Sequence, residues 1–209
     1  MAAPPKTVLE TTAEEEAAIR DAVRTADPAA LGPARVLASG GHAEAVLDLL
    51  ADPAVSEPIY ALPKPLTLAS VSAWIDECQV ARMRGEGLLI LNMIEGGPAM
   101  GYSKITVWPG CASAELGGAI RASLQNSGSG GAGAAHTIGW IFKALKVRLI
   151  CLTAAFDNVR SAKLIDRIGF RRMGERDVHR PDGTIRRSLY WELTAAEWAD
   201  LALHVPPRE

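Results

Sequence analysis

Hydrophobic positions in the first 85 residues follow mostly helical spacing. Apolar residues that recur every three or four positions mark the buried face of an amphipathic helix. This spacing predicts helices over three ranges, 11–24, 42–52 and 67–85. Thr11 or Thr12 is a suitable capping residue for the first of them. A short strand is expected at 34–39, and the prolines between positions 53 and 65 repeatedly break the chain.

After Gly85 the pattern changes to that of strands. Three strand-like segments follow one another, at 87–94, 99–108 and 113–122. They are separated by the turn sequences Glu95–Pro98 and Pro109-Gly110. Short strands joined by tight turns are typical of antiparallel pairing. The sequence therefore predicts a three-stranded antiparallel meander in the middle of the chain.

The second half mixes both kinds of pattern. Its expected elements are a helix over 132–145, an apolar strand at 147–155, a helix over 158–168, a hairpin of 171–180 and 184–193, and a helix over 194–204. Gly169 stands where a helix C-terminus favours glycine. A continuous apolar strand is typical of one buried on both faces. The order of helices and strands predicts one α/β domain built on a mixed sheet.

Composition and charge exclude several classes of protein. The 209 residues are 48% hydrophobic and 22% charged with a net charge of −2, a balance that does not fit a general nucleic-acid binder. No apolar run is long enough for a membrane span, and the first 20 residues lack the pattern of a signal peptide. The only cysteines are Cys78, Cys111 and Cys151, and the four histidines show no metal spacing. We expect reduced thiols, no metal site and a cytoplasmic location.

A glycine-rich stretch, Ser127–Gly133, joins a predicted strand to a predicted helix. Glycine backbones can direct successive N–H groups into one concavity, and the following helix adds the positive end of its dipole. Such a loop suits a phosphate group. The pattern G-x-G-x-x-G is present, but the acidic residue of a dinucleotide site and the lysine of a P-loop are absent. Taken alone, the stretch fits a flexible loop and an anion cradle equally well.

The residues around this stretch resemble a known family. Gln125–Gly130 reads Q-x-x-G-x-G, and Asn158–Ser161 followed by Gly169-Phe170 reads N-x-x-S…G-F. In this order and spacing they resemble the GCN5-related N-acetyltransferases (GNAT family). The segments "LADPAVSEPIYALPKPLTLASVSAWI", "AELGGAI" and "NVRSAKLIDRIGF" are most similar to the RimJ/RimL-like branch, which implies a bacterial enzyme. The resemblance covers about residues 34–195.

The resemblance implies a fold and a division of the chain. It implies the GNAT fold, an α/β fold in which helices flank a mixed, mostly antiparallel central sheet. Two neighbouring strands of that sheet splay apart to admit acetyl-CoA. Residues 1–33 would then be an N-terminal helical extension, and 34–209 the acetyltransferase domain. A homodimer stays open.

The resemblance also assigns a set of residues to acetyl-CoA. Gln125 and the backbone amides of the loop would bind the pyrophosphate, and these are Asn126, Ser127, Gly128, Ser129 and Gly130. Backbone groups of Ala119, Ile120 and Arg121, on the preceding strand, would hold the pantetheine arm. Asn158 would hydrogen-bond the same arm, with a simple helix N-cap as the alternative role.

The implied reaction moves an acetyl group to a primary amine by direct attack in a ternary complex. A neutral amine must lose a proton as it attacks, so a base is needed. Glu115 is the candidate base, and an exposed or paired strand carboxylate is the alternative. Ser161 stands where the branch hydrogen-bonds the thioester sulfur, and a helix-surface serine is the alternative. Tyr102 is a further candidate donor, because Ile165 replaces the tyrosine that many family members use.

Two features leave the function partly open. Ser127 replaces a basic residue of the branch, and Gly131–Gly133 lacks its glutamate, so a non-catalytic acyl-CoA-binding module is the rival hypothesis. The acceptor, a protein N-terminus or a small-molecule amine, is not encoded in any motif. Six arginines on the final hairpin are interpreted as a solvated strand face, with an acidic-substrate site or a contact to the 3′-phosphate as the alternatives: Arg171, Arg172, Arg176, Arg180, Arg186 and Arg187.

Overall fold

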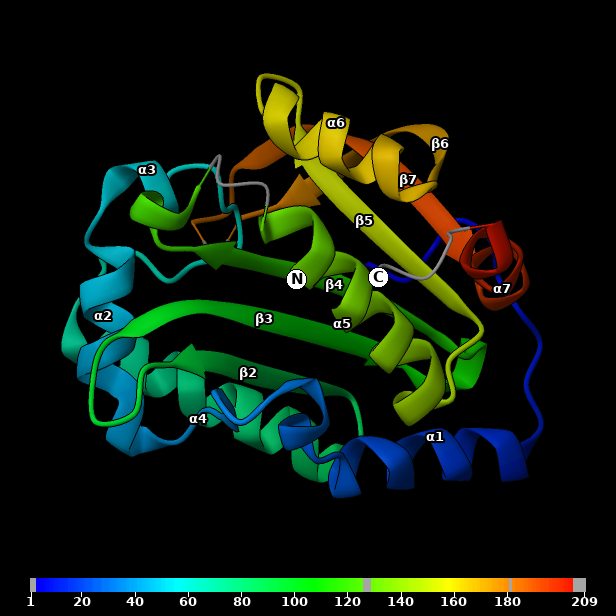
Figure 1. Cartoon of the computed structure of the whole chain (residues 1–209), viewed down its shortest axis with the longest axis horizontal. Helices are drawn as coiled ribbons and strands as arrows, with labels where there is room; N and C mark the ends of the chain where they lie inside the picture. Colours follow the sequence, from blue (N-terminus) through cyan, green and yellow to red (C-terminus); the bar gives the residue numbers. More distant parts are fainter. Residues whose placement is uncertain (1–2, 126–128, 181, 205–209) are drawn as a thin grey trace.

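The computed structural model describes residues 3–125, 129–180 and 182–204 and contains one seven-stranded sheet (Figure 1). The strands lie in the order β1-β2-β3-β4-β5-β7-β6, and every neighbouring pair is antiparallel except β4 and β5. Their bounds are Arg35–Leu37 (β1), Gly87–Met93 (β2), Ala99–Trp108 (β3), Ser113–Ile120 (β4), Leu149–Ala155 (β5), Arg171–His179 (β6) and Ile185–Thr194 (β7). The predicted mixed, mostly antiparallel sheet is confirmed. No described helix has the length and apolar character needed to cross a membrane.

Seven α-helices accompany the sheet in the described part of the chain. They are α1 (Ala13–Thr25), α2 (Ala43–Leu50), α3 (Pro53–Ser56), α4 (Leu68–Arg84), α5 (Ser129–Leu145), α6 (Val159–Ile168) and α7 (Ala195–His204). Thr12 caps α1 by accepting a hydrogen bond from the Glu15 N–H, and Thr67 caps α4 in the same way. Two predicted bounds are wrong, because β4 ends at Ile120 and α5 begins at Ser129. The structure also shows α3 in the proline-rich segment, where no helix was predicted.

Each face of the sheet has its own hydrophobic layer. On one face, which we call the α5 face, side chains of α1, α5 and α6 pack against alternate residues of β2 to β7, among them Ile105, Ile150 and Trp191. On the opposite face, which we call the α4 face, α2 and α4 pack against Leu89, Leu91 and Tyr102. Figure 1 shows α5 in front of the sheet and α4 behind it. The hydrophobic layer on the α4 face lies mainly over β1 to β3. Helices α2 and α4 therefore leave the α4 face of β5 to β7 open.

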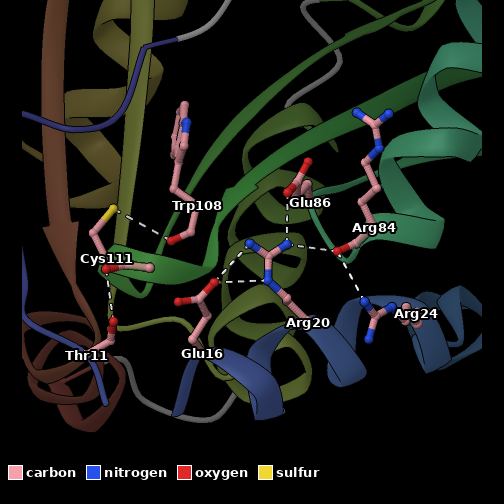
Figure 2. A network of polar contacts seen from close by, with 9 residues as sticks. Thr11, Glu16, Arg20, Arg24, Arg84, Glu86, Trp108 and Cys111 are labelled. Carbon is pink, nitrogen blue, oxygen red and sulfur yellow. Dashed lines mark hydrogen bonds and ion pairs between the residues drawn. The ribbon is translucent and has the colours of Figure 1, made fainter. Parts of the chain in front are cut away.

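Helix α1 belongs to the same hydrophobic layer as the sheet, since its Ile19 and Val23 are fully buried there. A polar network fixes its position (Figure 2). Arg20 forms ion pairs with Glu16 and Glu86 at 2.9 and 2.8 Å, and it donates to the Arg84 carbonyl at the end of α4. Burial and these polar partners hold α1 against the rest of the described chain.

The segment before α1 crosses the molecule to the last two strands. Thr7 donates its N–H and its hydroxyl to the carboxylate of Glu192 on β7, at 3.0 and 2.5 Å. The Lys6 N–H donates to the Tyr190 hydroxyl, and Arg176 donates to the carbonyls of Ala3 and Pro4. We call residues 3–7 the N-terminal strap. It covers part of the α4 face that α2 and α4 leave open.

Candidate active site

The two parallel strands β4 and β5 separate in the middle of the sheet. They pair only at Ser113, Ala114 and Glu115, opposite Leu149, Ile150 and Cys151. Beyond that point β4 pairs only with β3, and β5 only with β7, among the described residues. The open edge of β4 includes Gly117 and Gly118, which are exposed. The predicted splay is therefore present, and an extended ligand has free backbone groups to bind along β4.

Glu115 lies where the two strands separate. It is the last residue of β4 to pair with β5, and the register places its side chain on the α4 face with Cys151 and Thr153. The Thr153 hydroxyl donates to Glu115 Oε1 at 3.2 Å. The side chain is half-buried, so Glu115 is not a solvated strand carboxylate. No ion pair with it occurs in the described part of the chain.

The surroundings of Glu115 have opposing effects on its acidity. Burial raises the pKa of Glu115 above its ordinary value. Hydrogen bonds from Thr153 and Tyr60, and the charges of Arg176 and Lys104, act in the lowering direction but do not cancel the effect of burial. A carboxylate with a raised pKa is a stronger base than an exposed one. The arrangement suits Glu115 to accept a proton more readily than an exposed glutamate does.

Sequence reasoning missed several groups that surround Glu115. Tyr60 comes from the loop between α3 and α4, and the Arg186 guanidinium stacks over its ring at 5.0 Å. Arg176 lies over the Tyr190 ring at 4.3 Å. Alternate positions on the paired strands β5 and β7 carry polar side chains on this face, namely Thr153, Arg186, Ser188 and Tyr190. Alternation of polar residues within 149–155 and 185–194 was the sequence signal that could have found them.

The interpretation of the hairpin arginines as a solvated face fits three of the six. Arg171, Arg172 and Arg187 are exposed and form surface ion pairs with Glu197, Asp166 and Glu175, as a solvated face would. Arg176, Arg180 and Arg186 instead are half-buried, and register places Arg176 and Arg186 on the α4 face, on the side of Glu115. The strand alternation sends neighbouring arginines of β7 to opposite faces.

The residues expected to bind the pantetheine arm lie at the end of β4. Ala119 and Ile120 pair with Tyr102 and Gly101 of β3. Arg121 is held by an ion pair with Asp48 at 2.6 Å, by hydrogen bonds from its side chain to the Ala99 carbonyl, and by its N–H to the Met100 carbonyl. Tyr102 is buried, and its ring packs edge-on against Trp74 at 5.5 Å.

The two halves of the acetyl-CoA motif meet in the structure. Gln125 donates its side-chain N–H to the Ile120 carbonyl at 3.1 Å, and Arg160 of α6 donates to Gln125 Oε1. Asn158 Oδ1 accepts from the Ser161 N–H at 3.1 Å, so Asn158 caps α6. Of the loop residues, Ser129 and Gly130 begin α5, whereas Asn126, Ser127 and Gly128 lie outside the described residues. Gln125, the first residue of the Q-x-x-G-x-G motif, is therefore in direct contact with Arg160 of the N-x-x-S motif.

Comparison with known proteins identifies the family. A family model described as "Acetyltransferase (GNAT) domain" matches residues 35–171. The chain therefore belongs to the GNAT acetyltransferase family, and it is an acetyl-CoA-dependent N-acetyltransferase. No curated protein matches the sequence significantly.

Solved structures of low sequence identity share the fold. Ribosomal-protein-S5-alanine acetyltransferase from Vibrio fischeri is 14% identical with a TM-score of 0.65, over 78% of this chain and 93% of that one. RimJ from Mycobacterium smegmatis, in complex with CoA-disulfide, is 21% identical with a TM-score of 0.65, over 78% and 82%. AAC(6')-Ib in complex with ribostamycin and coenzyme A is 19% identical with a TM-score of 0.65, over 79% and 94%. These neighbours include the branch that the sequence motifs resemble.

Proposed function

We propose that this enzyme acetylates a primary amine, of a protein N-terminus or a small molecule, by direct attack in a ternary complex. The observation that carries the proposal is the position of Glu115. A half-buried carboxylate with a raised pKa lies at the point where β4 and β5 separate. In this proposal the thioester enters along the open edge of β4, and the amine approaches from the α4 face.

The proposed step balances as follows. The lone pair of the neutral amine attacks the thioester carbonyl carbon, and the nitrogen loses one proton to the Glu115 carboxylate, directly or through water. The C–S bond of the tetrahedral intermediate then breaks, and the sulfur leaves as a thiolate that takes up a proton. A backbone N–H on the open edge of β4 stabilises the oxyanion. The products are the amide and the free thiol of CoA.

The remaining predicted residues have supporting roles in this proposal. Gln125 and the amides of 126–130 bind the pyrophosphate at the N-terminus of α5, where the helix dipole favours an anion. Ala119 to Arg121 and Asn158 flank the pantetheine arm. Ser161, half-buried in the first turn of α6, hydrogen-bonds the sulfur. The three cysteines are free, which supports a reducing, cytoplasmic environment.

The decisive experiment compares Glu115→Gln with Glu95→Gln, a control at an exposed turn residue. Thiol release from acetyl-CoA is followed across a panel of primary amines, and CoA affinity is measured by calorimetry. We expect Glu115→Gln to lose about 100-fold or more in kcat, since general bases contribute about 10²–10⁴-fold, with CoA affinity unchanged. Full activity of this variant would refute the assignment of the base. Acetyl-CoA binding by the wild type with no thiol release for any amine would favour the non-catalytic module.

A further inference from the structure

Three cationic side chains surround Glu115, and they come from three different strands. Lys104 of β3 and Arg176 of β6 interact electrostatically with the Glu115 carboxylate, as does Arg186 of β7. Register places all three on the α4 face: Lys104 is opposite Leu89 of that hydrophobic layer, Arg176 is opposite Ser188, and Arg186 is two residues from Ser188. One carboxylate with a raised pKa is therefore faced by three cations.

These three cations lack a carboxylate partner of their own, unlike six arginines elsewhere in the described part of the chain. Six arginines form ion pairs within 4.0 Å elsewhere, namely Arg20, Arg121, Arg148, Arg171, Arg172 and Arg187. No such pair joins Lys104, Arg176 or Arg186 to a carboxylate in residues 3–125, 129–180 and 182–204. Removing a charge partly from water has a cost that an ion of opposite charge offsets, so three such cations on one face suit an anionic ligand.

Arg186 is the best oriented of the three. Its Nη1 donates to the Pro58 carbonyl at 2.7 Å, its Nε donates to the Ser188 hydroxyl at 3.1 Å, and its plane stacks on Tyr60. These contacts fix the guanidinium, while its Nη2 group has no protein acceptor in the described part of the chain. Burial lowers the pKa of Arg186, which shows that the charge is partly removed from water. A guanidinium held in this way is preorganised to bind a carboxylate or phosphate.

Other charges nearby do not neutralise this cluster. Asp157, at the end of β5, interacts with Arg186 but is itself exposed, and Arg180 adds a further positive charge beside it. Glu192 is fully buried and already accepts hydrogen bonds from Thr7 and Tyr190. Neither carboxylate forms an ion pair with Lys104, Arg176 or Arg186 among the described residues.

We infer that the acceptor is an amine that also carries an anionic group, which Arg186 binds while the amine faces Glu115. This inference rests on the proposed function and narrows its acceptor class. A carboxylate on the same molecule as the amine satisfies the unpaired guanidinium, whereas a polyamine or an aminoglycoside places further positive charge among three cations. The carboxylate belongs either to a free amino acid or to an acidic side chain near a peptide N-terminus.

The test uses pairs of acceptors that differ by one negative charge, and kcat/KM refers to the neutral amine, because amidation of alanine also lowers the pKa of its amine. Alanine is compared with alaninamide, and a C-terminally amidated Ala-Asp peptide with its Ala-Asn counterpart; spermidine is the polycationic acceptor. The variant is Arg186→Gln, and the control is Arg187→Gln, whose side chain is exposed and lies on the opposite face of β7. We expect the full-length wild type to prefer the carboxylate acceptor at least about tenfold in kcat/KM, because a charge-assisted hydrogen bond contributes about that much. The first pair tests for a free amino acid, and the second for an acidic peptide.

Arg186→Gln should remove that preference while leaving CoA affinity unchanged, and Arg187→Gln should keep the preference. Acceptor binding to the CoA complex is measured in parallel by calorimetry, so the inference is tested even where turnover is absent. Equal use of both members of each pair, or a preference that survives Arg186→Gln, overturns the inference. If the inference fails but turnover still depends on Glu115, the proposed function stands. If no amine is acetylated at all, the proposed function itself is contradicted.

Discussion

In the proposed mechanism, Glu115 accepts a proton in an environment that disfavours its charge. Its pKa is raised chiefly by burial, so the ionised form that accepts a proton is populated only above the ordinary range of a glutamate. Because the pKa is higher in the folded than in the unfolded chain, ionisation of Glu115 lowers the free energy of unfolding as pH rises through that range. The position of the proposed base therefore has a cost in stability at the pH at which it is ionised.

This environment predicts the pH dependence of the reaction. As pH falls through the raised pKa of Glu115, the base becomes protonated and kcat/KM for a fixed acceptor falls about tenfold per pH unit. The acid limb of the profile should therefore lie above pH 4.5, the ordinary value for a glutamate. Initial rates of thiol release, measured between pH 5 and 9 and corrected for ionisation of the amine, check the position of the acid limb. If the residual activity of Glu115→Gln shows the same acid limb, the group that titrates there is not Glu115.

Thr153 provides a second prediction at the scale of a single residue. Its hydroxyl donates to Glu115 Oε1 at 3.2 Å and stabilises the ionised carboxylate. Thr153→Val keeps the shape but removes this donor, so the pKa of Glu115 should rise further and the acid limb should move to higher pH by about 0.5–1 unit. The same profile for Thr106→Val, on the neighbouring β3, serves as the control. An unshifted limb in Thr153→Val would show that this hydrogen bond does not affect the reacting form.

At the scale of helices and strands, periodicity predicted most of the architecture. The meander, the order of the strands along the chain and the hairpin are confirmed, because alternation and turn residues are local properties. Helix α3 was missed because its Pro53 lies at the first helical position, where proline is favoured, among other prolines that signal a break. The pairing of β5 with β7 rather than β6 depends on long-range contacts that no local pattern encodes.

The candidate site was predictable only in part, for a related reason. Glu115 and the Gln125–Gly130 loop lie in recognisable motifs, whereas Tyr60 and Arg186 reach the site from segments 126 positions apart in the chain. Arg176 and Arg186 lie on the same hairpin as arginines that face solvent, so the sequence alone did not distinguish them. Only the side of the strand on which they lie, set by register, separates the two groups.

The contact between Gly85, at the end of α4, and Arg20 of α1 allows a test of how tightly these two helices pack. Gly85 ends α4 with a φ of 75°, and a Cβ there would lie 2.6 Å from the Arg20 Cα of α1. Gly85→Ala should therefore lower the free energy of unfolding by about 2–4 kcal/mol, from backbone strain together with the clash. Gly96→Ala is the matched control, since Gly96 has a φ of 63° and open space around it. If urea denaturation shows equal losses of unfolding free energy for the two variants, α1 moves to relieve the clash at Gly85.

At the scale of the whole molecule, the N-terminal segment connects the two ends of the sheet. Helix α1 packs on the α5 face near β2 and β3, whereas the strap lies on β7 and β6 at the far edge (Figure 1). The link depends on Glu192, which is fully buried. Burial alone raises the pKa of Glu192, but hydrogen bonds from Thr7 and Tyr190 outweigh it and hold the pKa below its ordinary value. The strap therefore stabilises an ionised carboxylate inside the protein.

Removing one of these donors should weaken the whole fold. Thr7→Val deletes the hydroxyl that donates to Glu192 and should lower the free energy of unfolding by about 1.5–3 kcal/mol, the usual effect of a hydrogen bond to a charged group. Because the pKa of Glu192 is lowered by folding, its contribution is present above the ordinary glutamate pKa and is lost as pH falls. The deficit of Thr7→Val should shrink in urea titrations below that range. Thr11→Val, which loses an exposed hydrogen bond to the Gly110 carbonyl, is the control.

The strap also has a consequence for the order in which the protein matures on the ribosome. Lys6 and Thr7 are synthesised well before their partners Tyr190 and Glu192, which follow 184 and 185 positions later. Their docking must therefore await the synthesis of β7, and contacts of such long sequence separation form late in folding. A nascent chain stalled before β7 should leave residues 3–7 open to proteases and cotranslational enzymes, and the released protein should protect them.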